Sequence, residues 1–204
     1  MMPRLPSPGI PHLWWIDAEA QEVAPWRAGI LARYLGVLPA DIRIVRNRFG
    51  KPMLGDPAPL AFNTSHSGGW TVLAISGGEP IGVDIEAVQA FPELGAVAHV
   101  HFAADVAAGI HALPAGRRAR AFAREWTRLE ARLKCAGHGF GRRETASWRE
   151  GQIVSFSLGT IVGAIASEVP LMAPRWYRIA RSQPRTSIGE RRSGLPPIAD
   201  LELA

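Results

Sequence analysis

The stretch Ile81-Gly82-Val83-Asp84-Ile85-Glu86 alternates apolar and acidic residues, and it determines how the rest of the chain is interpreted. Successive side chains of a β-strand point to opposite faces, so Val83 and Ile85 indicate a buried face. Asp84 and Glu86 would then direct two carboxylates to the opposite face. The pattern predicts a half-buried strand that gathers its acids on one side.

A third acidic position lies in Trp126-Thr127-Arg128-Leu129-Glu130-Ala131-Arg132-Leu133-Lys134. Residues four apart on a helix share a face, so Glu130 and Lys134 place a carboxylate beside an ammonium. If this helix packs on the strand, three carboxylates and a lysine converge. Such a set suits Mg²⁺ holding a substrate phosphate, with the lysine opposite a phosphate leaving group. The structural alternative is a solvated strand face and a Glu–Lys surface pair, both of which are common.

Lysine is rare in this chain, which holds 21 Arg and only two Lys. Lys51 stands in Gly50-Lys51-Pro52, and Lys134 follows Glu130 at i+4. A lysine in so arginine-rich a chain indicates that a compact, pKa-adjustable ammonium is wanted in place of a guanidinium fork.

Between these motifs lies the polar segment Phe62-Asn63-Thr64-Ser65-His66-Ser67-Gly68-Gly69-Trp70. Taken alone, it is interpreted as a turn between apolar runs whose backbone N–H groups could face an anion. Taken alone, His66 is more typical of a structural histidine than of a site residue.

In order, the chain contains Gly-Lys-Pro, Phe-Asn-x-Ser-His-Ser-Gly, Gly-Val-Asp-Ile-Glu and Trp-Thr-x-x-Glu-Ala-x-x-Lys-x-x-Gly-x-Gly. From about residue 46 to residue 140 this series resembles the 4′-phosphopantetheinyl transferase family, in its longer, pseudo-dimeric type. The resemblance implies an α+β fold of two tandem, similar α/β half-domains with pseudo-twofold symmetry and an active site at their interface. The expected division is residues 1–86, residues 87–177 and a mobile basic tail over residues 178–204.

An internal similarity fits two halves. Residues 65–75 match residues 155–165 at Ser, Ser, Gly, Val, Ala and Ile, at an offset of 90. A chance Ser/Gly-then-Val pattern is the alternative explanation.

The resemblance also implies an activity: Mg²⁺-dependent transfer of 4′-phosphopantetheine from coenzyme A to a serine of an apo acyl or peptidyl carrier protein. Glu130 would activate that serine, directly or through water, and Lys134 would stabilise or protonate the departing 3′,5′-ADP. The implied metal ligands are Asp84, Glu86 and Glu130. The implied coenzyme A contacts are Lys51, Pro52, Ser65, His66 and Lys134.

Two departures from the family pattern bear on activity. Leu129 stands where the family has a basic residue, and the segment between the first strand and the first long helix lacks the basic stretch that helps relatives to bind the 3′-phosphate. That phosphate is expected to be held loosely, with Arg27, Arg33 and Arg46 as possible substitutes. These departures leave open a degenerate, non-enzymatic basic relative. The same site chemistry also leaves open a Mg²⁺-dependent phosphohydrolase, in which water replaces the serine.

Composition agrees with a globular protein, at 47% hydrophobic and 20% charged residues. A net charge of +5 fits a nucleotide, a nucleic acid or an acidic protein partner. We expect coenzyme A and a carrier protein as partners, no nucleic acid, no membrane and a monomer.

One cysteine excludes an internal disulfide and fits a reducing cytoplasm. Residues 1–11 lack the apolar region of a signal peptide, and the uncharged residues 153–167 are too few to span a membrane.

Periodicity predicts further elements. Strands are expected over residues 13–16, 41–46, 70–75 and 81–85, the last two as partners, and one long strand or two over residues 153–167. Helices are expected over residues 26–38, 97–110 and 117–135, and Gly137 and Gly139 would stop the third. The expected core face of that third helix consists of Phe122, Trp126, Leu129 and Leu133.

Overall fold

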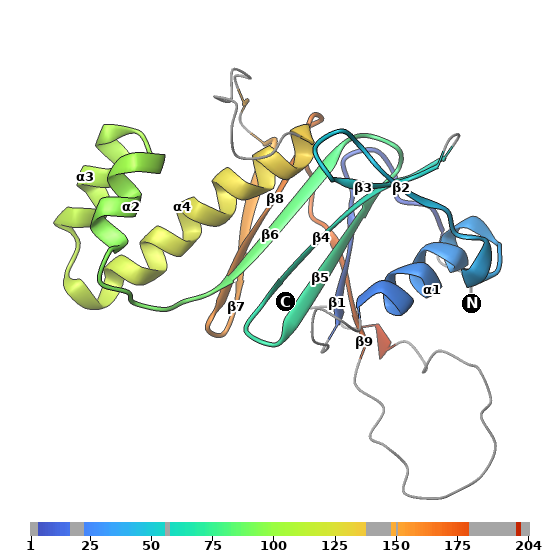
Figure 1. The fold of residues 1–204 in the computed structure, drawn as a ribbon, viewed down its shortest axis with the longest axis horizontal. Coiled ribbons are helices and arrows are strands. Elements are labelled where there is room, and N and C mark those ends of the chain that lie inside the picture. Colours follow the sequence, from blue (N-terminus) through green and yellow to red (C-terminus); the bar gives the residue numbers. More distant parts are fainter. Residues whose placement is uncertain are drawn as a thin grey trace, which may run out of the picture.

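The structure is a computed structural model that describes residues 4–16, 23–55, 58–137, 148–149 and 151–179 and the backbone of 199–200. It is a mixed α+β fold (Figure 1). The helices are α1 (Val23–Leu35), the 3₁₀ turn η2 (Pro39–Asp41), α2 (Leu94–His101), α3 (Ala104–Ala112) and α4 (Ala115–Ala136). The strands are β1 (His12–Ile16), β2 (Ile44–Arg46), β3 (Pro52–Leu54), β4 (Ala61–Ser67), β5 (Trp70–Ser76), β6 (Ile81–Ala87), β7 (Ile153–Leu158), β8 (Ile161–Ser167), β9 (Arg175–Ile179) and β10 (Ala199–Asp200).

Two main sheets have the orders β10-β9-β1-β5-β4 and β6-β8-β7, and β2 and β3 form a separate hairpin. In the first sheet β1 lies antiparallel to β5, the second strand of the β4–β5 hairpin. In the second sheet β6 lies antiparallel to β8, the second strand of the β7–β8 hairpin. The prediction that residues 81–85 pair with residues 70–75 was therefore wrong. The true partner of β6 is far along the chain, and a local alternation carries no information about such a partner.

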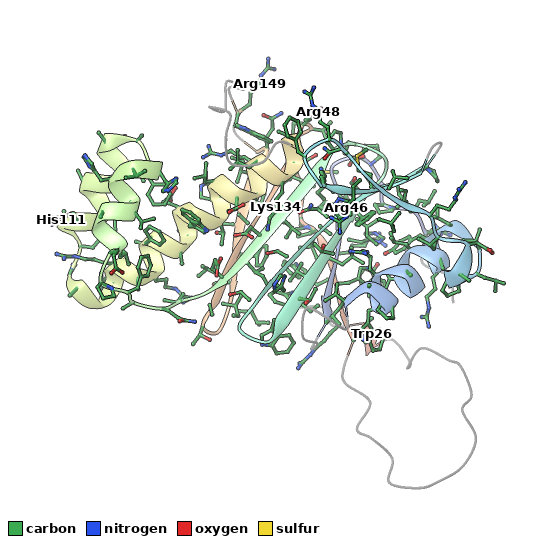
Figure 2. All side chains as sticks on the ribbon, in the orientation of Figure 1. Trp26, Arg46, Arg48, His111, Lys134 and Arg149 are labelled. Carbon is green, nitrogen blue, oxygen red and sulfur yellow. The ribbon has the colours of Figure 1, made fainter. Side chains whose placement is uncertain are left out.

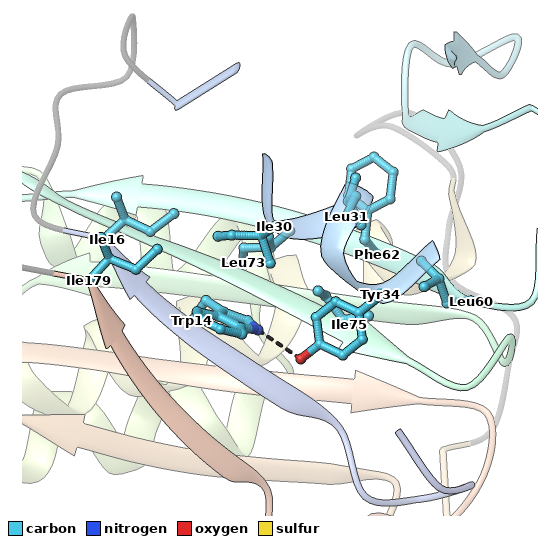
Figure 3. Close-up of a cluster of buried hydrophobic side chains, with 10 residues drawn as sticks. All are labelled: Trp14, Ile16, Ile30, Leu31, Tyr34, Leu60, Phe62, Leu73, Ile75 and Ile179. Atoms are coloured by element: carbon cyan, nitrogen blue, oxygen red, sulfur yellow. Dashed lines mark hydrogen bonds between the residues drawn. The ribbon is translucent and has the colours of Figure 1, made fainter. Parts of the chain in front are cut away.

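Helix α1 covers the outer face of the five-stranded sheet (Figure 3). Its Ile30 and Leu31 pack on Trp14 and other apolar residues of β1 and β5. The indole Nε1 of Trp14 donates a hydrogen bond of 3.0 Å to the hydroxyl of Tyr34, so this core also contains satisfied polar groups.

A second core lies between the two main sheets, where Leu13 and Trp15 of β1 meet Val83 and Ile85 of β6. The predicted alternation of β6 is confirmed, because Val83 and Ile85 are fully buried on this side. The remaining face of the three-stranded sheet is covered by α4, which Figure 1 shows running along β6.

Several expected elements differ in detail from the structure. The helix expected over residues 97–110 is two helices, α2 and α3, because Phe102 and Ala103 adopt extended backbone angles. The helix expected over residues 26–38 runs from Val23 to Leu35, and the strand expected over residues 41–46 is limited to residues 44–46. The polar segment interpreted as a turn is largely a strand, β4. Arg178 and Ile179, assigned to the tail, belong to β9. Gly139, residues 180–198 and residues 201–204 lie outside the described residues.

The core face of α4 was only partly predicted. Phe122 and Leu133 are buried, whereas Trp126 and Leu129 are only half-buried. The side that meets β6 and β8 includes small residues, Ala131 and Cys135, which pack on Ala164 and Ala166. None of the helices in the described ranges is both long enough and apolar enough to cross a membrane.

Candidate active site

The site begins at Gly82, where β6 and α4 approach each other closely. A Cβ atom at Gly82 would overlap the carbonyl oxygen of Ala131 and the amide nitrogen of Cys135. Both are backbone atoms of the helix, so they could not move aside without displacing α4. The glycine and the small helix residues thus let the strand that carries Asp84 lie directly against the helix that carries Glu130 and Lys134.

An ion pair joins helix and strand at this point. The Nζ of Lys134 lies 2.6 Å from Oδ1 of Asp84 and 3.3 Å from the hydroxyl of Ser65. The same Oδ1 accepts a hydrogen bond of 2.8 Å from Ser65. Figure 2 shows Lys134 near the middle of the molecule, between α4 and the strands. The predicted convergence of the strand acid and the helix lysine is confirmed.

The second oxygen of Asp84 is different. Asp84 is only 3% exposed, and its Oδ2 is buried without a hydrogen-bond partner among the described residues. Burial raises the pKa of this carboxyl above its ordinary value, although Lys134 and Ser65 act in the opposite direction. A buried carboxylate oxygen without a donor favours a cation as its missing partner.

Glu86 and Glu130 complete an acidic group around Asp84. Burial raises the pKa of each, and the negative charge of Asp84 raises both further. Glu86 also raises the pKa of Glu130, which places all three carboxyls within electrostatic reach of one another. In the described part of the chain, however, no three acidic, histidine or cysteine side chains already stand close enough to hold a metal ion. A metal bridge would require side-chain adjustment.

A cavity of about 260 Å³ opens beside these groups. Its walls come from the β2–β3 hairpin, from β4 and from α4, and they include Lys51, Pro52, Thr64, Glu130 and Lys134. The Gly-Lys-Pro motif and the helix motif, which lie far apart in the sequence, therefore border the same space. A cavity lined by two lysines and a glutamate suits a phosphate-bearing ligand.

The two lysines are engaged differently. The Nζ of Lys51 donates to the carbonyl oxygens of Ile81 and Cys135, at 3.2 and 3.1 Å, and so clamps the hairpin to β6 and α4. Burial lowers the pKa of Lys51. Lys134 instead pairs with a carboxylate. A nucleotide contact by Lys51, expected from the resemblance, stays a prediction.

Ser65 and His66 lie on opposite sides of β4. Ser65 is buried beside Asp84, whereas His66 is exposed, and its charge lowers the pKa of Glu86. The hydroxyl of Ser65 donates to Asp84 and accepts from Lys134 and from the amide of Ile85. A hydroxyl has one hydrogen and two acceptor sites, so that of Ser65 is fully used. The hydroxyl of Ser65 is therefore not free for the phosphate contact that was expected of it. The side chain of His66 is exposed and accessible to a ligand.

Sequence reasoning gave no role to Asn47 or Ser67. The side-chain oxygen of Asn47 accepts hydrogen bonds from the amides of Phe49 and Lys51. Its Nδ2 donates a hydrogen bond of 2.9 Å to the carbonyl of Gly137, the residue that caps α4. It thereby shapes the cavity wall. An Asn three residues before Gly-Lys, at the start of a hairpin turn, was the available signal. Ser67 donates to Glu86 at 2.9 Å, and its place two residues after Ser65 was the signal.

Comparison with known families agrees with this geometry. The profile described as the 4′-phosphopantetheinyl transferase superfamily matches residues 80–169, which include β6, α4 and the β7–β8 hairpin. The match covers 90 of the 204 residues, and the resemblance recognised from the motifs is thus confirmed.

Curated relatives extend the similarity. The chain is 34% identical over 118 residues to 4′-phosphopantetheinyl transferase HetI of Nostoc sp. (strain PCC 7120), which covers 56% of this chain and 50% of that protein. It is 36% identical over 116 residues to 4′-phosphopantetheinyl transferase AcpT of Salmonella typhi, which covers 56% of this chain and 59% of that protein. With 4′-phosphopantetheinyl transferase psf-1 of Bacillus pumilus it shares 37% identity over 90 residues, covering 44% and 37%. The aligned part thus spans between 37% and 59% of the length of these relatives.

Proposed function

We propose that this protein transfers 4′-phosphopantetheine from coenzyme A to a serine of an apo acyl or peptidyl carrier protein. The observation that carries the proposal is the convergence of Asp84, Glu86, Glu130 and Lys134 where β6 meets α4. The family match and the names of the relatives give the chemistry that such a group would perform.

Mg²⁺ fits the residues that are present. Asp84 offers a buried oxygen with no partner among the described residues, and Glu86 and Glu130 offer two more carboxylates. Burial, and then the charge of Asp84, raise the pKa of each of these two groups. Hard carboxylate oxygens at a site that can also admit water and phosphate suit this ion. When bound, Mg²⁺ would neutralise the pyrophosphate of coenzyme A as a Lewis acid.

The residues of the chain then carry the proton and the charge. Glu130 takes the proton of the carrier serine, directly or through a water molecule, as the serine oxygen bonds to phosphorus. The bond from phosphorus to 3′,5′-ADP breaks, and Lys134 neutralises or protonates the oxygen that leaves. Such a reaction depends on positioning and charge neutralisation more than on covalent help from the protein.

The cavity beside Glu130 and Lys134 is the proposed coenzyme A side, with Lys51 and Pro52 in its wall. The exposed His66 is two residues along β4 from Thr64, which also lines the cavity. Next to this cavity, Arg46 donates a hydrogen bond of 2.7 Å to the carbonyl oxygen of Gly50, which lines it. Burial, and then the charge of Arg46, lower the pKa of Arg27, and its buried Nε has no partner in the described structure. Two guanidinium groups within electrostatic reach of each other suit a phosphate, so we assign the 3′-phosphate to this pair.

The architecture is proposed to be a tandem duplication, with halves over residues 1–86 and 87–177 acting as a monomer. Its support is the repeated order of strand, helix and hairpin, in which β1-β5-β4 corresponds to β6-β8-β7. Matching the two hairpin turns aligns Ser67 with Leu158, one residue away from the offset of 90 suggested by the sequence. The three-stranded sheet takes in β6, so the sheet boundary falls a few residues before residue 86.

The test is incubation with coenzyme A, Mg²⁺ and a panel of apo carrier proteins, followed by intact-mass measurement of each carrier. We expect a phosphopantetheine adduct that disappears with a Ser→Ala carrier and with the Asp84→Ala or Glu130→Ala enzyme. Hydrolysis of coenzyme A without a carrier would support the phosphohydrolase instead. Binding of coenzyme A without any turnover would support the degenerate relative.

A further inference from the structure

Side chains of β4, not its backbone, join it to β6. The amides of Val83, Ile85 and Ala87 donate hydrogen bonds to the side chains of Asn63, Ser65 and Ser67, at 2.9, 3.2 and 3.0 Å. Each donor is 20 residues after its acceptor, so the three bonds repeat with the strand period. The contact between β4 and β6 is thus a row of polar side chains beside the acidic face of β6.

Two members of this row do more than accept. The hydroxyl of Ser65 donates 2.8 Å to Oδ1 of Asp84, and the hydroxyl of Ser67 donates 2.9 Å to Oε2 of Glu86. Each serine hydroxyl therefore accepts a hydrogen bond from the amide of the residue that follows the acid. It also donates a hydrogen bond to the carboxylate of that acid. Because the amide fixes the acceptor side of the hydroxyl, its hydrogen points in one direction.

In each carboxylate, one oxygen accepts a hydrogen bond from a serine hydroxyl and the other does not. Ser65 and Asp84 are 5% and 3% exposed, so their geometry is fixed by packing as well as by the hydrogen bond. With Oδ1 held, Oδ2 of Asp84 has no partner among the described residues. Ser67 donates to Oε2 of Glu86 and not to Oε1. The two acids stand two residues apart on one face of β6, as the two serines do on β4.

We propose that Ser65 and Ser67 are positioning residues that orient Asp84 and Glu86 toward a shared divalent cation. The inference rests on the proposed function insofar as that function requires a cation at these carboxylates. A hydrogen bond to a ligating carboxylate fixes its rotamer before the metal arrives, and loss of such a partner commonly weakens metal binding tenfold or more. Neither serine touches the cation or the substrate in this proposal.

Asn63 is a matched control within the same row. It accepts the amide of Val83 as the serines accept theirs, but no carboxylate precedes Val83 on β6. A merely structural role for the row predicts that Asn63→Ala, Ser65→Ala and Ser67→Ala have similar effects. A positioning role predicts that only the serine variants weaken metal binding.

The experiment is titration of the full-length, substrate-free protein with Mn²⁺, followed by electron paramagnetic resonance, with circular dichroism to verify folding. Ser67→Ala should bind Mn²⁺ about tenfold more weakly, Ser67→Thr should restore binding because it keeps the hydroxyl, and Asn63→Ala should bind like the wild type. Ser67 is only half-buried, so its variant can be examined even if Ser65→Ala fails to fold.

Competition against bound Mn²⁺ gives a second readout. Mg²⁺ demands near-ideal octahedral geometry whereas Ca²⁺ tolerates irregular sites, so Ser67→Ala should lose more affinity for Mg²⁺ than for Ca²⁺. Folded Ser67→Ala with the Mn²⁺ affinity of the wild type, or an equal loss of affinity in Asn63→Ala, would overturn the positioning role. Neither result would contradict the proposed transferase function. Absence of Mn²⁺ binding by the wild type would overturn the cation site itself, and the positioning role with it.

Discussion

Lys134 on α4 and Asp84 on β6 form one ion pair across the helix–strand contact, with Nζ 2.6 Å from Oδ1. The carboxylate is almost fully buried, while its other oxygen has no partner in the described structure. That second oxygen could hold a cation while Oδ1 holds Lys134. In the proposed reaction Lys134 would have to leave Asp84 to contact the leaving phosphate.

Lys134→Ala should lower the rate of transfer more than it weakens coenzyme A binding. The charge is needed most as the leaving oxygen becomes negative, so its removal costs more in the transition state than in the bound complex. Lys134→Arg should restore activity only in part, since a guanidinium does not readily give up a proton. Transfer kinetics and calorimetric coenzyme A binding measure the two effects. Equal losses in rate and binding would make Lys134 a ground-state phosphate clamp.

Gly82→Ala should destabilise the protein by about 1–3 kcal/mol, because the new methyl group overlaps backbone atoms of α4 that cannot rotate away. Separation of α4 from β6 should also lower transfer, since Asp84 and Lys134 lie on opposite sides of the contact. Gly95→Ala is the control: nothing lies within 4 Å of its added Cβ, and this helix position should gain about 0.5–1 kcal/mol. Denaturant unfolding checks both, and a neutral Gly82→Ala would show that α4 shifts without cost.

The sequence predicted the acids of β6 and the helix of α4 because each pattern is local and has a clear period. It did not predict β4 as a strand, because Asn, Ser and His have low strand propensity and the segment ends in two glycines. Only the structure shows that amides of β6 satisfy the buried Asn63 and Ser65. The partner of β6 was also predicted wrongly, since an alternating strand specifies which face is buried and not which strand lies beside it.

Glu130→Gln should stabilise the metal-free protein at neutral pH while abolishing transfer. Burial and neighbouring acids raise the pKa of Glu130 in the folded state, so the folded protein binds more protons than the unfolded chain. Stability due to this group is therefore lost as pH rises through its unfolded pKa toward its folded pKa. The variant should gain a few °C in Tm at neutral pH, and the gain should shrink on acidification. Glu125→Gln on the same helix is the control. A Tm decrease in metal-free Glu130→Gln would contradict the expectation.

Acid should destabilise the folded protein through His12 of β1. Burial, with the charge of Arg175, lowers the pKa of His12 to about 4, and its Nδ1 lies 2.7 Å from the hydroxyl of Tyr34. The unfolded chain protonates this histidine near pH 6.5, so stability is complete above that pH and is lost as pH falls toward 4. The loss should approach about 3 kcal/mol. His12→Gln should flatten the Tm profile between these pH values, whereas the exposed His99→Gln should retain it. Equal slopes in both variants would exclude His12 as the cause.

The final prediction concerns the 3′-phosphate of coenzyme A. The missing basic stretch favours loose binding, with dephospho-coenzyme A competing nearly as well. Arg27 and Arg46 instead offer two guanidinium groups within electrostatic reach of each other, and the buried Nε of Arg27 lacks a partner among the described residues. We therefore expect the wild type to prefer coenzyme A over dephospho-coenzyme A. A charge-assisted contact contributes about 1.5–3 kcal/mol, which is more than tenfold in affinity.

Competition binding with the two coenzymes decides the question, with Arg33→Ala on the same helix as the control. Arg27→Ala and Arg46→Ala should each reduce the preference, because either change removes one of the two charges that face the phosphate. Arg33→Ala should keep the wild-type ratio. A wild type without preference would mean that the arginine pair does not replace the missing stretch. If transfer to every carrier were also absent, the chain would be a degenerate relative that keeps the fold and has lost turnover.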